Sequence, residues 1–166
     1  MADKIKGSTE SVEILSGVSQ KHPQSAYAGL QKSLQQEWAF VQRVTPGVGN
    51  AFRPVEMAPK ETFLPALFEG LGEGVTERGV TCLPVKQAGL ALSDPYQTAP
   101  ENWTASYVIT GHLVAELRGQ VEFQTAYHSA CLQEGWTAVR QRGQWRAEEA
   151  LTAALEGAPV FHARRL

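Results

Sequence analysis

The sequence predicts a mainly α-helical protein, an irregular bundle of five to seven helices with at most a small β-hairpin near residues 80–92. Apolar side chains recur at helical spacing in several stretches that Pro- and Gly-containing breaks separate. Only residues 81–92 have the pattern of extended chain. The length of 166 residues and the apolar fraction of 43% fit one core of ordinary size. We therefore expect residues 1–166 to form a single helical domain.

Two helices are expected in the first 44 residues. Ser8 is the expected N-cap of the first helix, because a serine hydroxyl can accept from the free N–H groups of the first turn. The apolar side chains that follow it at helical spacing are Val12, Leu15 and Val18. His22-Pro23 separates the two helices, since proline is favoured in the first turn of a helix. Residues 24–44 form the clearest helix, and its apolar stripe is Tyr27, Leu30, Leu34, Trp38 and Val41.

Residues 51–92 are expected to be less regular. Residues 51–59 should form a short, irregular helix, and residues 60–69 should form another that Pro65 kinks. Glycines at positions 70, 72 and 74 then indicate a loop, because no strand–turn–helix context surrounds them. Residues 81–92 are the one plausible extended region, either as two short strands or as ordered loop.

Longer helices are expected after Asp94-Pro95. The first covers residues 101–117 and ends at Gly119. The side chains on its apolar side are Trp103, Tyr107, Thr110, Val114 and Leu117. A second helix is expected over residues 121–142, and a separate helix rich in alanine and glutamate over residues 145–156. The apolar set of the second helix is Phe123, Tyr127, Cys131, Leu132, Trp136 and Val139.

The charge balance argues against a free-standing nucleic-acid-binding protein. The net charge is −2, whereas phosphate contacts usually require a basic surface. The charged fraction of only 19% indicates surface that is buried against another molecule. No apolar run reaches the roughly 20 residues that span a bilayer, and residues 1–15 contain no apolar signal core. We expect a cytosolic or nuclear protein, with a mature organellar protein as the alternative.

No stretch of the sequence matches a catalytic or cofactor-binding motif. Nucleotidyl transfer needs clustered carboxylates for two metal ions, yet Asp3 and Asp94 are the only aspartates. The G-x-S-x-G, P-loop and dinucleotide-binding patterns are absent. His128, Cys131 and Glu134 have the spacing of a partial metal site, but a helix surface with a packed cysteine is the commoner meaning of that spacing. We therefore predict no enzymatic activity, no cofactor and no metal.

Six basic residues are the candidates for contacting nucleic acid. Single-stranded and duplex binding surfaces often combine basic side chains with aromatic ones. Arginines lie close to Trp38 in one stretch and to Trp145 in another. A solvated helix face is the commoner meaning of such a cluster, and the glutamates at positions 148 and 149 dilute its charge. The six candidates are Arg43, Arg78, Lys86, Arg140, Arg142 and Arg146.

Three stretches of the chain together match a known pattern. They are HPQSAYAGL at residues 22–30, which continues through Trp38 to Arg43; FLPAL at residues 63–67; and a third stretch at residues 77–95, with ER, LPVK, AGLAL and DP in that order. The set resembles the region that follows the catalytic palm in reverse transcriptases of non-LTR and DIRS-like retrotransposons. In that family the pattern reads PQAAYxxF…W…xxR, F[IL]PAL and ER…LP[VA]R.GGLG[LI].[ND]P. The agreement covers residues 8–118 and leaves residues 119–166 as a C-terminal helical extension.

The resemblance implies a thumb-like or connection region that grips a primer–template duplex. The chain departs from the pattern in three ways. Ala88-Gly89-Leu90-Ala91 stands in place of GGLG, Lys86 replaces an arginine, and the palm with its catalytic aspartates is missing. Two hypotheses follow. The chain is either a structural or interaction subunit of a larger protein assembly, or a non-catalytic domain that binds an RNA or DNA duplex.

Overall fold

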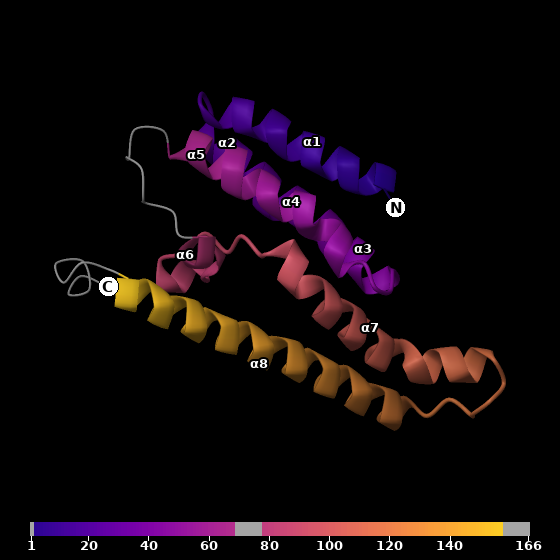
Figure 1. Ribbon diagram of the computed structural model, residues 1–166. Coiled ribbons are helices and arrows are strands. Elements are labelled where there is room, and N and C mark those ends of the chain that lie inside the picture. The colour runs from indigo at the N-terminus through magenta and orange to yellow at the C-terminus, as the bar shows by residue number, and fades with distance from the viewer. Residues whose placement is uncertain (1, 69–77, 158–166) are drawn as a thin grey trace.

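The structure of the protein is a computed structural model that describes residues 2–68 and 78–157. The described residues contain eight α-helical segments, α1 to α8, which π- and 3₁₀-helical turns join into six continuous helical stretches, and no strand; this confirms the predicted mainly α-helical bundle (Figure 1). The glycines at positions 70, 72 and 74, for which a loop was expected, lie outside the described residues.

Three helical stretches form the body of the molecule. The first is α1 (Ala2–Ser19). The second is continuous through α2 (Pro23–Gly29), η1 (Leu30–Leu34) and α3 (Gln35–Val44). The third is continuous through η2 (Gly49–Phe52), α4 (Arg53–Ala58), η3 (Pro59–Phe63) and α5 (Leu64–Leu67). Ser8 is not an N-cap, because α1 starts six residues earlier and buries Ser8 within it.

Both long stretches of the body contain a π-helical turn, η1 and η3. For η3 the sequence offers a reason. Pro59 and Pro65 stand at and just beyond this turn and supply no N–H group, so the regular i→i−4 ladder is interrupted on both sides. The interruption favours the wider hydrogen-bond register.

The core lies where these three stretches meet. Leu30 and Trp38 of the second stretch are buried, and Tyr27, Leu34 and Val41 pack against the core as half-buried side chains. The apolar stripe predicted for residues 24–44 is therefore confirmed. The other buried apolar members of this cluster are Val12, Ala26, Val48, Phe52, Val55, Ala58, Phe63, Leu64, Leu92 and Ala99.

Residues 78–94 form a compact, mostly irregular connection. It contains α6 (Arg78–Cys82) and the short 3₁₀ turn η4 (Val85–Gln87), followed by a stretch without regular structure. Of the two conformations expected for residues 81–92, ordered loop is the one observed after Cys82. The segment ends at Asp94, whose carboxylate caps the next helix by accepting from the N–H groups of Tyr96 (2.8 Å) and Gln97 (3.0 Å).

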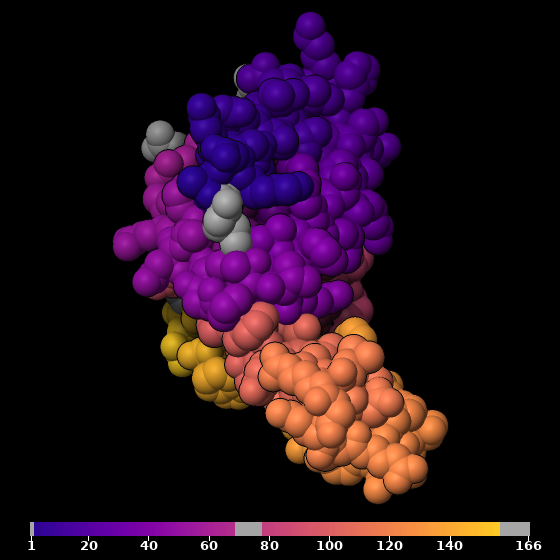
Figure 2. Space-filling view, turned by 90° about the vertical axis from the view of Figure 1, so that its right-hand side faces the viewer, coloured from indigo at the N-terminus to yellow at the C-terminus, as the bar shows by residue number. Residues whose placement is uncertain are grey.

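Two long antiparallel helices complete the fold. The first half of α7 (Pro95–Leu117) packs against α3, η2 and α4, and α8 (Thr125–Gly157) returns along α7 to reach α6. The end of this α7–α8 hairpin projects beyond the body, as the orange lobe in Figure 2 shows. The two separate helices predicted over residues 121–142 and 145–156 form one helix, α8, which continues through Gly143 without a break.

Candidate interaction surface

Tyr27, a residue of the first motif stretch, and the nearby Gln31 and Gln35 bind the irregular segment that precedes α7. The Tyr27 hydroxyl donates to the Leu90 carbonyl oxygen (2.6 Å), and Gln31 Nε2 donates to the same oxygen (3.2 Å). Gln35 Nε2 donates to the Ala91 carbonyl (3.2 Å), while its Oε1 accepts from the Ser93 N–H (2.6 Å). These side chains satisfy backbone groups of a loop that has no partner strand.

Gln42 also bonds to a backbone carbonyl group, at the first residue of α7. It is buried, and its Nε2 donates to the Pro95 carbonyl oxygen (2.8 Å). Its Oε1 accepts from Asn102 Nδ2 (2.6 Å) and from the Thr98 hydroxyl (3.3 Å) on α7. A buried amide with both ends satisfied fixes α7 on α3.

Arg78 ties α6, α4 and the irregular segment together. Its guanidinium forms two bonds to the Glu56 carboxylate (2.7 and 2.9 Å) and donates to the carbonyl oxygens of Leu92 (2.8 Å) and Ser93 (2.9 Å). Both side chains of the pair are only 13% exposed. Burial raises the pKa of Glu56, and the hydrogen bond from Arg78 opposes that rise. Arg78, one of the six basic candidates, has its guanidinium engaged inside the fold.

The backbone of the same segment adopts two unusual conformations. Ala88 has a φ of 62° and Ala91 a φ of 51°, both in the left-handed region that favours glycine. Between them, a Cβ atom on Gly89 would lie 2.1 Å from the Leu83 carbonyl oxygen. Glycine is therefore required at position 89 because of this close approach.

The residues considered for chemistry are not brought into a reactive arrangement. Burial raises the pKa of the Cys82 thiol, which disfavours the thiolate needed for a nucleophile. His128, Cys131 and Glu134 do not converge, because the described residues contain no group of three or more His, Cys, Asp or Glu side chains that could hold a metal ion. No helix in residues 2–68 and 78–157 is both long enough and apolar enough to cross a membrane.

The six basic candidates are spread over the molecule. Arg43 and Lys86 are exposed, but they belong to the end of α3 and to η4, toward opposite ends of the body in Figure 1. Arg140 and Arg142 are two residues apart on α8, so they point to opposite sides of the helix. Arg146 pairs with Glu101 of α7. The candidates therefore do not form one continuous basic surface.

The larger exposed feature is apolar and lies on the α7–α8 hairpin. Tyr107 (65% exposed) and Leu117 (83%) lie on α7, and Trp136 (54%) and Trp145 (64%) lie on α8. Isolated exposed apolar residues are ordinary, but a concentration along two helices indicates a binding surface. From the sequence, Tyr107 and Leu117 were expected on the apolar side of one helix and Trp136 in the apolar set of the next, whereas Trp145 was considered only beside its neighbouring arginines. The signal that was missed is that apolar residues occur on more sides of α7 than its two neighbours, the body and α8, can cover.

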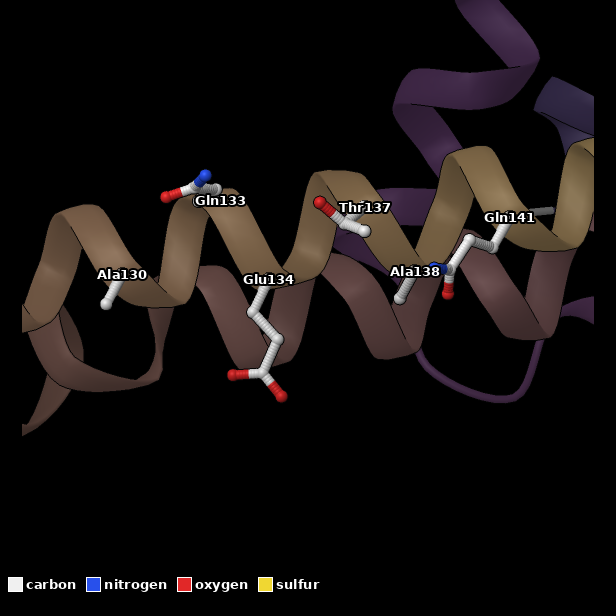
Figure 3. Close-up of a pocket in the computed structure, with 6 residues that line it drawn as sticks. All are labelled: Ala130, Gln133, Glu134, Thr137, Ala138 and Gln141. Atoms are coloured by element: carbon white, nitrogen blue, oxygen red, sulfur yellow. The ribbon is translucent and has the colours of Figure 1, made fainter.

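One side of α8 is an open, solvent-facing surface with a shallow hollow. Tyr127 and Trp145 are 18 residues apart, or five turns, so both exposed rings lie on the same side of the helix. Between them a shallow hollow runs along α8, and all of its lining residues belong to this helix (Figure 3). We call this side of α8 the outer face. Its hollow is lined by Ala130, Gln133, Glu134, Thr137, Ala138 and Gln141.

The opposite side of α8 lies directly on α7. A Cβ atom on Gly135 would meet Ile109 Cγ1 at 2.6 Å, so the two helices approach closely at this point. At the tip of the hairpin, His112 Nε2 accepts from the Gln124 N–H (3.0 Å), and the His112 ring stacks on Phe123 with centroids 5.6 Å apart. These contacts hold α8 against α7, whose first half packs against the body.

Comparisons of the chain with protein-family models, with curated proteins and with solved structures gave no match.

Proposed function

We propose that this chain is a non-catalytic helical module, derived from the reverse transcriptase of a retroelement, that acts as a structural or interaction subunit of a larger protein assembly. The observation that carries the proposal is the outer face of α8, where a shallow hollow lined by alanine and polar side chains lies between Tyr127 and Trp145. Exposed aromatic anchors beside a concave stretch are typical of protein interfaces.

The arrangement of the motif residues supports the retroelement origin. The first and third of the stretches that resemble the family are far apart in the sequence, yet they meet around residues 83–94. Tyr27 of the first stretch bonds to Leu90, and Arg78 of the third bonds to Leu92. Ala88 and Ala91, which stand where the family pattern has glycine, have the positive φ angles that glycine favours. The shared residues thus have structural roles that a palm-less module would retain.

The charges favour the interaction subunit over the duplex-binding alternative. Binding a duplex through several phosphates requires several free cations on one surface. Two of the six candidates, Arg78 and Arg146, are paired with glutamates, and the others point in different directions. With a net charge of −2, the chain also lacks a long-range attraction for nucleic acid.

The proposal is tested by isolating the tagged full chain from source extract and measuring the retained complex by native mass spectrometry. The wild-type chain should retain stoichiometric protein partners. The double variant Thr137→Arg/Trp145→Ser, which fills the outer face and removes one anchor, should lose them by about tenfold or more. Trp136→Ser is the matched control, because Trp136 is nine residues from Trp145 and lies on the opposite side of α8. Equal retention by the wild-type chain and the double variant would contradict the proposal.

A further inference from the structure

Charge is distributed unequally around α8. Seven residues make nearly two turns of an α-helix, so side chains at this interval lie in one row along it. The row on the outer face contains two glutamates and no basic residue; its members, all exposed, are Tyr127, Glu134, Gln141, Glu148 and Leu155. Within residues 2–68 and 78–157, neither glutamate of the row forms an ion pair. The outer face is therefore negatively charged.

The arginines of α8 lie away from this row. One residue corresponds to about 100° of rotation around an α-helix, so Arg140 and Arg142 point to either side of Gln141 rather than along the row. Arg146 points toward α7, where it pairs with Glu101. No arginine of α8 therefore lies between the two glutamates of the outer face to neutralise them.

The hollow on the outer face has the form that a partner helix can fill. Side chains four residues apart form ridges along a helix, and the ridges of a second helix fit into the groove between two of them. The six residues that line the hollow form two such rows (Figure 3). One row contains two alanines, whose short side chains leave the groove open. The rows are Ala130, Glu134 and Ala138, and Gln133, Thr137 and Gln141.

Two exposed aromatic rings accompany the glutamates. Tyr127 begins the row, and Trp145 lies at the i, i+3 spacing of helix neighbours from Glu148. The face of such a ring attracts the guanidinium group of arginine, and a carboxylate holds the same group by two parallel hydrogen bonds. Arginine fits this combination better than lysine does, because its planar group both stacks and pairs. A nucleic acid or an acidic segment would meet like charge here, so charge complementarity favours an arginine-rich protein segment.

We infer that the outer face of α8 binds an amphipathic helix of a partner protein whose charged residues are mainly arginines. This inference rests on the proposed interaction role and states the chemistry of the partner. The apolar side of the partner helix lies in the hollow, and its arginines pair with Glu134 and Glu148. These two glutamates are about 21 Å apart along the helix axis, so the arginines that reach them are about two heptads apart.

Fluorescence anisotropy with the full chain and a labelled synthetic helix of about 18 residues, or five turns, tests the partner chemistry. One peptide has leucine and alanine on one side and arginine on the other, and a second has glutamine in place of arginine. The chain should bind the arginine peptide about tenfold more tightly at about 50 mM salt, and the difference should shrink at about 200 mM because salt screens the charges. Equal binding of the two peptides, or binding of neither, would overturn the inference.

Charge reversal tests whether the outer face is the site. Glu134→Lys/Glu148→Lys should weaken binding of the arginine peptide by about tenfold or more, because like charges would then face each other. Glu13→Lys/Glu61→Lys is the matched control, since it changes the net charge equally at exposed positions of α1 and η3. The control should bind within about threefold of the wild-type chain at about 200 mM salt, where distant charges are screened. Equal losses in both variants would overturn the inference.

The extract experiment separates failure of this inference from failure of the proposed function. Thr137→Arg/Trp145→Ser reports whether any partner occupies the outer face, and Glu134→Lys/Glu148→Lys reports whether the charge of that face holds it. Loss of the same partner from both variants is the expected result. A partner that only Thr137→Arg/Trp145→Ser loses would leave the proposed function standing and overturn the arginine-rich helix.

Discussion

Arg78 is the one charged side chain among those that connect the body to the segment before α7 in the described residues. Its guanidinium joins Glu56 of α4 to the carbonyl oxygens of Leu92 and Ser93 just before α7. Removing the guanidinium would leave the largely buried Glu56 carboxylate and the carbonyl oxygen of the buried residue Leu92 without their donor.

Arg78→Met should therefore lower the free energy of unfolding by about 3 to 5 kcal/mol, the usual cost of breaking a buried ion pair. Urea unfolding followed by circular dichroism measures this difference. Arg140→Met is the matched control, because Arg140 is exposed on α8 and its removal should change stability by less than about 0.5 kcal/mol. Similar losses in both variants would contradict the structural role of Arg78.

At Ala88 and Ala91, whose φ angles are positive, we expect substitution to increase the stability of the fold. Ala88→Gly and Ala91→Gly should each raise the free energy of unfolding by about 0.5 to 1 kcal/mol, since glycine adopts a positive φ without steric cost. Thermal unfolding of the single and double variants measures the effect. Ala130→Gly, in the regular part of α8, should instead lower stability by about 1 kcal/mol.

At the scale of elements, the contact between α7 and α8 decides whether the hairpin is rigid. The helices approach most closely at Gly135, where any larger side chain meets Ile109. Elsewhere on α8 the space is open, as at Gly143, where an added Cβ atom would have no neighbour within 4 Å. Two glycines of one helix therefore have different roles.

Gly135→Leu should lower the free energy of unfolding by about 1 to 3 kcal/mol through overpacking against α7. Gly143→Ala should raise it by about 0.5 to 1 kcal/mol, because alanine has the higher helix propensity and meets nothing. Thermal unfolding monitored by circular dichroism compares the two variants. Stabilisation by both substitutions would show that the helices are not in close contact at Gly135.

Helical spacing alone was sufficient to predict the fold class and the buried side of residues 24–44. It was not sufficient for residues 101–117, because a stripe such as Tyr107, Val114 and Leu117 has the same periodicity whether a neighbour covers it or not. It also could not assign Arg78, whose partner Glu56 lies 22 residues earlier in the sequence. The basic residues were grouped by sequence proximity, and the helical geometry of α8 separates Arg140 from Arg142.

At the scale of the whole molecule, the distribution of charge predicts weak binding of nucleic acid. Fluorescence anisotropy with an RNA–DNA primer–template should detect no binding tighter than about 100 µM at 200 mM salt, the weak end of the range for non-specific binding. Arg140→Ala/Arg142→Ala should leave the titration unchanged. Micromolar binding that falls steeply between about 50 and 200 mM salt, and that this double variant loses, would support the duplex-binding alternative instead.

The unequal burial of the tryptophans gives the protein its own set of optical probes. Trp38 is buried in the core (3% exposed), whereas Trp136 and Trp145 are on the surface of the hairpin. Indole emission shifts to the blue and escapes aqueous quenchers when the ring leaves water. Unfolding of the body should therefore be visible mainly through Trp38, and occupation of the outer face mainly through Trp145. Chains that retain one tryptophan at a time would separate the two events by colour and quenching, without an added dye.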